Sequence, residues 1–191
     1  MPDAAREALR RDLSRTIAGM QDVVGRGDER GNLRLGSVRE LRDYCYVVAG
    51  IVGEMLTELF LIDRPELAPV AGALRRRSRF FGEGLQLVNI LKDCASDATE
   101  GRVYLPAGVD RRIVFDLARG DLERAAEYVA ALQDSGAPEG FVAFTASPAI
   151  LARASLDRLE ERGPGSKIGR DEVAALMEKM FEDIGAGVRP L

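Results

Sequence analysis

Four polar side chains near the middle of the sequence are spaced to share one face of a helix. Gln86, Asn89, Asp93 and Asp97 follow one another at intervals of three or four residues, so at about 100° per residue they fall within an arc of about 80°. Two carboxylates one turn apart repel each other unless a cation lies beside them. Carboxylate and amide oxygens suit Mg²⁺ or Mn²⁺ better than Zn²⁺. The stripe therefore predicts a site for a hard divalent metal ion.

A metal ion on such a stripe implies chemistry on a diphosphate. Mg²⁺ bound by one or two carboxylates keeps coordination positions open, which substrate phosphate oxygens fill. The ion then neutralises the negative charge that develops on a departing phosphorylated group. The alternative is an ordinary solvated acidic face, because acidic residues at helical spacing are common. The sequence contains no histidine, which excludes Ser-His-Asp and Cys-His catalysis and histidine-based zinc sites.

A second stretch, YCYVVAGIVG at residues 44–53, combines small residues with an apolar helical pattern. Glycine inside a helix costs about 0.5–1 kcal/mol relative to alanine, so Gly50 and Gly53 need a reason. Either another helix packs very close, or an elongated ligand passes beside the backbone. Residue types alone favour close packing over the ligand. Tyr44 would be an aromatic at the edge of the core, with its hydroxyl satisfied there.

The remaining pattern predicts helices and almost no strand. Ser37 followed by Glu40 is a capping box that begins a long apolar helix. Gly-rich polar loops are expected at 25–36 and 98–112. Helices are expected at 3–24, 38–62, from Pro65 to 97 with a break near Gly72, and at 112–118, 120–134, 138–162 (bent at Pro148) and 170–185. We expect one all-α domain over residues 1–191.

Composition narrows the class of protein. Apolar residues make up 46% and the net charge is −4, which indicates a globular chain and argues against nucleic-acid binding. No run approaches the ~18–20 apolar residues of a membrane span, and the charged N-terminus shows no signal peptide. Cys45 and Cys94 are expected to be reduced core thiols. We therefore expect a cytoplasmic location. The arginines at 75, 76, 77 and 79 are interpreted mainly as a solvated face.

Together the two stretches resemble the squalene/phytoene synthase family. Its members have a Y-C-x-x-V-A-G-x-V-G helix followed by L-Q-x-x-N-I-x-[RK]-D-x-x-x-D-x-x-x-G-R-x-Y-x-P. In this sequence the first pattern runs from Tyr44 to Gly53 and the second from Leu85 to Pro106, and Gly19-Met20 resembles a family G-M upstream. The second pattern is long and specific, so agreement by chance is improbable.

The resemblance implies a prenyl-synthase-type helical bundle around a central apolar cavity. Its activity would be Mg²⁺-dependent (or Mn²⁺-dependent) head-to-head condensation of two farnesyl or geranylgeranyl diphosphates, in squalene, carotenoid or other terpenoid biosynthesis. NADPH would be needed where squalene is formed, and greasy substrates imply peripheral contact with a membrane. By matching positions, the resemblance makes Asn89, Asp93 and Asp97 metal ligands, with Asp93 and Asp97 catalytic. It makes Tyr44, Gly50, Gly53, Gln86 and Arg102 substrate-binding residues.

The sequence departs from the family pattern at two places. The family's first aspartate-rich motif lies upstream of Gly19-Met20, where no D-x-x-x-[DE] candidate of this sequence fits; Asp12, for example, has Thr16 four residues on. Val47 stands where many members have an aromatic residue. We therefore expect the N-terminal helices of the fold to be missing and apolar surface to be exposed. Three hypotheses remain: a truncated synthase, a non-catalytic helical binding or assembly protein, and one half of a split enzyme whose partner chain supplies the first aspartate-rich motif.

Overall fold

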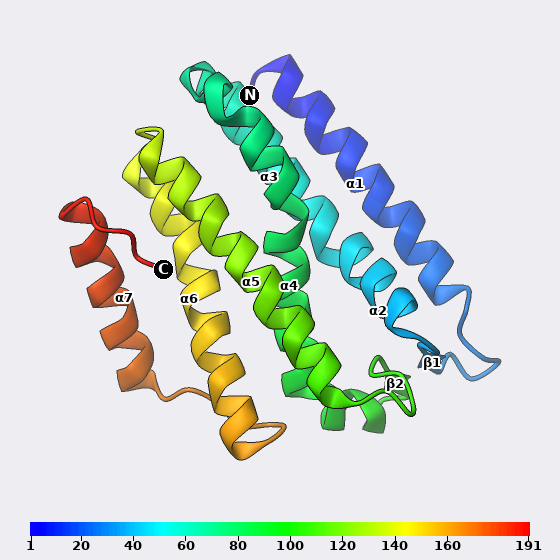
Figure 1. Cartoon of the computed structure of the whole chain (residues 1–191). Helices are drawn as coiled ribbons and strands as arrows, with labels where there is room; N and C mark the ends of the chain where they lie inside the picture. The colour runs from blue at the N-terminus through cyan, green and yellow to red at the C-terminus, as the bar shows by residue number, and fades with distance from the viewer.

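The computed structural model describes residues 1–191 as a set of long, packed helices (Figure 1). The helices are α1 (Asp3–Val24), α2 (Val38–Cys45), α3 (Ile51–Asp63), α4 (Ala71–Thr99), α5 (Arg111–Asp134), α6 (Glu139–Arg162) and α7 (Arg170–Gly185). A π-helical turn (Tyr46–Gly50) joins α2 to α3, and a 3-10 helix (Pro65–Val70) precedes α4. Two short strands, β1 (Leu33–Arg34) and β2 (Arg102–Val103), pair in parallel. The predicted all-α fold is confirmed.

Helix α4 lies in the middle of the molecule. It packs against α5, α3 and α6, while α1, α2 and α3 lie on one side of it and α6 and α7 on the other (Figure 1). Its residues Leu87 and Leu91 are fully buried in the largest hydrophobic cluster, together with Leu41 and Cys45 of α2. The polar stripe of α4 is therefore fixed by a core that packs against the opposite face of the same helix.

The predicted capping box begins α2. The Ser37 hydroxyl accepts a hydrogen bond from the Glu40 amide at 3.2 Å, and the Glu40 carboxylate accepts one from the Gly36 amide at 2.7 Å. The Glu40 carboxylate thus binds the amide of Gly36, the residue before the N-cap Ser37, and not the amide of Ser37 itself. The two hydrogen bonds fix the direction in which the chain enters α2.

The segment from Val38 to Asp63 is long and apolar enough to cross a membrane by length and composition, with a mean hydropathy of 1.8 in its most apolar window. The expectation that no run reaches this level was wrong, because it counted uninterrupted apolar residues, whereas charged residues such as Glu54 and Glu58 interrupt this segment without making it polar on average. The segment packs against α1 and α4, and core helices of soluble proteins have the same composition. The π-helical turn inside it was not predicted.

Other boundaries differ from the sequence-based expectation. The helices predicted at 112–118 and 120–134 form the single helix α5, because residues on both sides of Gly120, Ala118 and Leu122, are buried in one hydrophobic cluster with α4. Helix α6 continues through Pro148. The break predicted near Gly72 is the step from the 3-10 helix into α4. Strands β1 and β2 lie in the two segments that were predicted as loops. Each strand has only two residues, which is too short to show the alternation of apolar and polar residues that identifies a strand.

Candidate functional site

The structure brings the predicted polar stripe together with two other predicted residues in one pocket, hereafter the polar pocket. Its volume is about 450 Å³. It is lined by Gln86, Asn89, Ile90, Asp93 and Asp97 of α4, by Tyr44 of α2, and by Arg102 and Tyr104 of the following loop. Six of these eight residues are ones that the sequence singled out for metal or substrate binding.

Two cations of the chain lie beside the carboxylates of the polar pocket. Lys92 Nζ lies 3.3 Å from Asp93 Oδ2 and donates to Asn89 Oδ1 at 3.3 Å. Arg102 Nη2 lies 3.5 Å from Asp97 Oδ1 and also pairs with Glu100. The contacts of Lys92 with Asp93 and of Arg102 with Asp97 are longer than ordinary charged hydrogen bonds, whereas Glu100 holds the Arg102 guanidinium closely. The polar pocket thus combines negative charge on α4 with the positive charge of Arg102 in its lining.

The loop that positions Arg102 is tied to the first strand. The amides of Leu33 and Leu35 donate to the carbonyls of Gly101 and Val103, both at 3.0 Å. Gly101 has φ of 79°, and a Cβ there would lie 2.1 Å from Asn32 Oδ1. Only glycine fits this position, which explains the glycine of the G-R-x-Y-x-P pattern. The tie between β1 and β2 directs the side chain of residue 102 to the end of the acidic stripe.

Tyr44 and Tyr104 form the aromatic wall of the polar pocket. Their rings stack with centroids 4.6 Å apart and planes inclined by 22°. Burial raises the pKa of Tyr44 well above its ordinary range, and the neighbouring Tyr104 and the carboxylate of Asp97 raise it further. Its hydroxyl therefore stays protonated at neutral pH and can donate a hydrogen bond to an anion. Tyr104 was not predicted as a site residue, although it stands in the quoted pattern.

An apolar pocket of about 160 Å³ adjoins the polar one. Val48, Ala49, Val52, Gly53, Leu56, Phe81, Gly82 and Leu85 line it, together with Gln86 and Asn89. The two amide side chains therefore belong to both pockets and mark the boundary between them. The combined site suits a ligand with an anionic head and an apolar chain.

The small residues of the YCYVVAGIVG stretch provide close helix packing. A Cβ at Gly53 would lie 2.1 Å from the Ser78 carbonyl oxygen of α4, and one at Gly82 would lie 2.0 Å from the Ala49 carbonyl oxygen. Gly53 and Gly82 also line the apolar pocket, so packing and access to a ligand coincide there. Gly50 lines neither pocket and is buried against Tyr46 and Glu83. Gly82 was missed, although a glycine in the middle of a long helix was the available signal.

A buried charge network lies behind the π-helical turn and was not predicted. Glu83 is 0% exposed and lies 2.7 Å from Arg42 and 2.8 Å from Arg79. Arg42 also pairs with Asp121 of α5. Burial raises the pKa of Glu83 and Asp121 against the pull of these arginines. The network joins α2, α4 and α5 and so holds the turn beside the apolar pocket.

The interpretation of the four arginines as a solvated face is corrected for Arg79, whose guanidinium binds the buried Glu83, whereas Arg75 and Arg76 are exposed as expected. Arg79 belongs to the buried network described above. Arg75 binds Glu58 with two hydrogen bonds, and Arg77 binds Glu127. The partners of Arg75 and Arg77 lie on α3 and α5, so their sequence neighbours gave no sign of them.

The donors in the polar pocket fit a hard metal ion shared with a ligand. The chain has no group of three or more Asp, Glu, Cys or His side chains placed to enclose an ion alone. Asp93, Asp97 and Asn89 supply two carboxylates and one amide on one wall of the pocket. Mg²⁺ is commonly held through one or two carboxylates, with phosphate oxygens and water completing its shell. The residues present therefore fit such an ion once a diphosphate shares it.

Comparison with known proteins gives the family. The family model for squalene/phytoene synthase matches residues 3–173. The chain is 42% identical over 79 residues to a phytoene synthase of Thermus thermophilus, an alignment that covers 40% of this chain and 24% of that protein. It is 32% identical over 119 residues to a squalene synthase of Ganoderma lucidum, which covers 60% of this chain and 25% of that protein.

A bifunctional lycopene cyclase/phytoene synthase of Phaffia rhodozyma is 44% identical over 71 residues, covering 35% of this chain and 10% of that protein. In these alignments the chain spans a quarter or less of each relative's length. The family model, in contrast, matches nearly the whole chain, and its match includes both pockets. The chain therefore belongs to the squalene/phytoene synthase family.

Proposed function

We propose that this chain binds prenyl diphosphates and takes part in their Mg²⁺-dependent head-to-head condensation. The observation that supports this most strongly is the junction of the polar and apolar pockets at Gln86 and Asn89. A prenyl diphosphate has the same division, with a charged head that needs cations and a hydrocarbon tail that needs an apolar wall. The family names of the relatives, phytoene synthase and squalene synthase, agree with this choice of substrate.

Each side chain of the polar pocket has a role in this proposal. Asn89, Asp93 and Asp97 would hold the metal ion, which would supply positive charge beside the diphosphate leaving group. Arg102 turns from Asp97 to donate to phosphate oxygens, and an arginine fork binds phosphate well. The protonated hydroxyl of Tyr44 donates a further hydrogen bond.

The apolar pocket protects the reacting carbon atoms. Loss of diphosphate from an allylic carbon leaves a cation that water would quench. Gln86 lies at the boundary, where its amide oxygen can face the positive carbon. Val48, Val52 and Leu85 keep water from the tail. A second prenyl diphosphate then supplies the double bond that attacks the cation, and loss of a proton closes a cyclopropyl diphosphate that still carries the second diphosphate group.

A split enzyme is the second candidate. Two carboxylates and an amide lie on one wall of the polar pocket, and no third acid of the chain joins them. Leu13 and Ile17, one turn apart on α1, are 51% and 58% exposed, as expected for a helix face that meets another chain. A partner chain with its own aspartate-rich helix would complete the metal shell. NADPH as reductant, peripheral membrane contact and a cytoplasmic location remain parts of the proposal.

Product formation from labelled farnesyl or geranylgeranyl diphosphate tests the proposal. The chain is incubated with Mg²⁺, and released diphosphate and extracted hydrocarbon products are measured. We expect turnover that EDTA and Asp93→Asn abolish, either by the chain alone or after addition of a separate chain with a D-x-x-x-D helix. Turnover that persists in Asp93→Asn would refute the assigned metal site. Binding without turnover under both conditions would favour the non-catalytic binding protein.

A further inference from the structure

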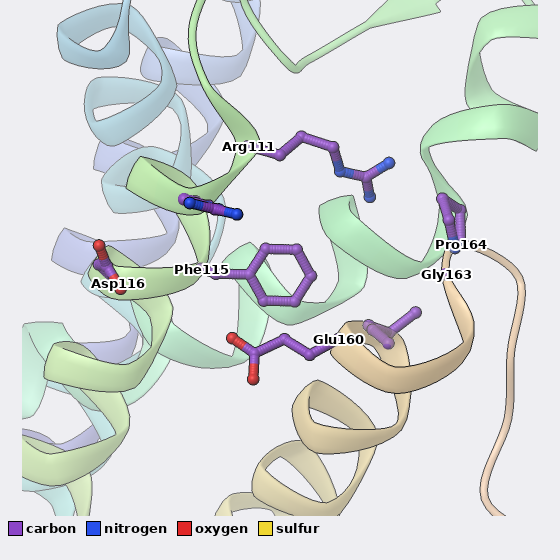
Figure 2. Close-up of a pocket in the computed structure, with 8 residues that line it drawn as sticks. Arg111, Phe115, Asp116, Glu160, Gly163 and Pro164 are labelled. Carbon is purple, nitrogen blue, oxygen red and sulfur yellow. The ribbon is translucent and has the colours of Figure 1, made fainter.

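A third pocket, hereafter the arginine pocket, lies between the start of α5 and the end of α6. Its volume is about 550 Å³, larger than the polar pocket. Figure 2 shows Arg111 and Phe115 projecting into it from α5, opposite Gly163 and Pro164, with Glu160 below the ring. It shares no lining residue with the polar or the apolar pocket. The proposed prenyl transfer therefore makes no use of it.

Two arginines in this pocket have no acidic partner. Neither Arg111 nor Arg112 lies within 4.0 Å of a carboxylate, whereas the acid below the ring, Glu160, pairs with Arg119. Asp116 is the other acid that lines the pocket, and it is exposed. Two adjacent guanidinium groups thus face one cavity with unused charge. An arginine fork matches the oxygens of a phosphate group in geometry and charge.

The arginine pocket is partly preorganised. The Arg111 guanidinium donates to the Leu91 carbonyl of α4 at 3.2 Å and lies 6.0 Å from the centroid of the Phe115 ring. These contacts hold it in place without neutralising its charge. Arg112 is exposed and makes no side-chain hydrogen bond, so it is free to close over an anion. The N-terminus of α5 adds a weak positive potential, which is partly used by the Asp110 side chain that caps the Arg112 amide at 2.9 Å.

The arginine pocket lies beside the part of α4 that precedes Asp93. The Gly165 amide, in the loop that closes the pocket, donates to the Lys92 carbonyl at 3.0 Å. Arg111 and this loop therefore contact the backbone of α4 at Leu91 and Lys92, the two residues that precede Asp93. The arginine pocket therefore adjoins the helical turn that presents Asp93 to the polar pocket.

We propose that the arginine pocket binds a phosphate-bearing small molecule through Arg111 and Arg112, at a site separate from the prenyl diphosphate site. The phosphate lies between the two guanidinium groups. The face formed by Phe115, Leu159 and Pro164 accommodates an uncharged part of the molecule. Inorganic diphosphate and a nucleoside diphosphate share this chemistry, so the experiment includes both as probes.

Calorimetric titration in the presence of EDTA tests the arginine pocket. EDTA removes divalent metal ions, so metal-dependent binding in the polar pocket does not contribute. The intact chain is titrated with inorganic diphosphate and, separately, with ADP. We expect saturable binding that Arg112→Gln weakens at least about tenfold, because hydrogen bonds to a charged group contribute about 1.5–3 kcal/mol. The exposed Arg112 side chain makes no hydrogen bond or ion pair, so we expect its replacement to leave the fold intact, which circular dichroism checks. Arg170→Gln, at an exposed arginine without an acidic partner on α7, is the matched control and should bind as the parent chain does.

The outcomes distinguish a nucleotide ligand from a free phosphate compound. They also distinguish binding in the arginine pocket from binding in the polar pocket. ADP binding more tightly than inorganic diphosphate indicates a nucleotide ligand, and equal binding indicates a free phosphate compound. No saturable binding of either probe, or unchanged binding by Arg112→Gln, overturns the proposal. Binding that Arg102→Gln abolishes while Arg112→Gln retains it also overturns the proposal, because the anion then lies in the polar pocket. None of these results depends on prenyl transfer.

Discussion

Arg102 reaches back over α4, so that its Nη2 atom lies 3.5 Å from Oδ1 of Asp97. The last carboxylate of the acidic stripe therefore has a cation of its own chain as partner. A metal ion at this carboxylate would compete with Arg102, and a diphosphate would draw the guanidinium away from it. The contact thus couples metal binding to diphosphate binding in the polar pocket.

Replacing Arg102 should have opposite effects on the binding of Mg²⁺ and on the binding of a diphosphate. We expect Arg102→Gln to strengthen Mg²⁺ binding in the absence of diphosphate by up to about fivefold, since exposed ion pairs contribute about 0.2–1 kcal/mol. The same change should weaken binding of a prenyl diphosphate analogue in the presence of Mg²⁺. Calorimetry measures both. Arg170→Gln should change neither, and a parallel loss of both affinities would mean that Arg102 holds the loop rather than the anion.

The Tyr44 hydroxyl should contribute to diphosphate binding without supporting the fold. Tyr44→Phe keeps the ring stacked on Tyr104 and removes only the donor. We expect binding of the analogue with Mg²⁺ to weaken about tenfold, as for a lost hydrogen bond to a charged group. Tyr46→Phe is the control, because that hydroxyl bonds to Arg15 and Glu54 outside the pocket. Equal effects of the two changes would argue against a role for Tyr44 in binding.

The packing between α3 and α4 should not tolerate a single methyl group. The Cβ of Gly53→Ala would lie 2.1 Å from a backbone oxygen of Ser78, so the helices must separate. We expect a loss of about 1–3 kcal/mol in the free energy of unfolding, measured by urea denaturation. Gly120→Ala, in open space on α5, should stabilise the chain by about 0.5–1 kcal/mol. A destabilisation common to both variants would show that helix propensity in these positions was misjudged.

One surface ion pair should give stability a measurable pH dependence. Hydrogen bonds from Arg75 hold the pKa of Glu58 below its ordinary value of 4.5. The unfolded chain therefore takes up this proton first as the pH falls. The stabilisation is complete above the unfolded pKa and is lost as the pH falls through the folded one.

Comparison of the parent chain with Glu58→Gln checks the direction of this pH dependence of stability. The parent should be more stable by about 0.2–1 kcal/mol at pH 7, and the difference should vanish at strongly acid pH. Glu161→Gln removes an exposed carboxylate without an ion-pair partner and should show no such trend. A difference that grows as the pH falls would contradict the assignment.

Sequence patterns were sufficient for the parts of the site that lie on one helix. The spacing of Gln86, Asn89, Asp93 and Asp97 fixes their common face, because a helix has a known period. The ends of α1, α6 and α7 followed from the same periodicity. The capping box at Ser37 is a local interaction, so its residues alone identified the start of α2.

Features that depend on contacts between distant segments could not be predicted in this way. The π-helical turn at Tyr46–Gly50 and the ion pair of Glu83 with Arg42 depend on packing against other helices. Glu83 looks like any surface glutamate in the sequence, yet it is fully buried. The stack of Tyr44 on Tyr104 joins residues 60 positions apart. Gly120 led to the wrong prediction of a break inside α5. The low helix propensity of glycine suggested a break, and the sequence does not show that the surroundings of this residue are open.

The central claim is that the α4 stripe binds a diphosphate through a metal ion. Calorimetric titration of a non-hydrolysable farnesyl diphosphate analogue, with and without Mg²⁺, tests it most directly. The parent chain is compared with the Asp93→Asn/Asp97→Asn variant and with Asp116→Asn, which removes a carboxylate from the arginine pocket instead. We predict Mg²⁺-dependent binding by the parent and by Asp116→Asn, and none by the double variant. Mg²⁺-dependent binding that survives in the double variant would contradict the account.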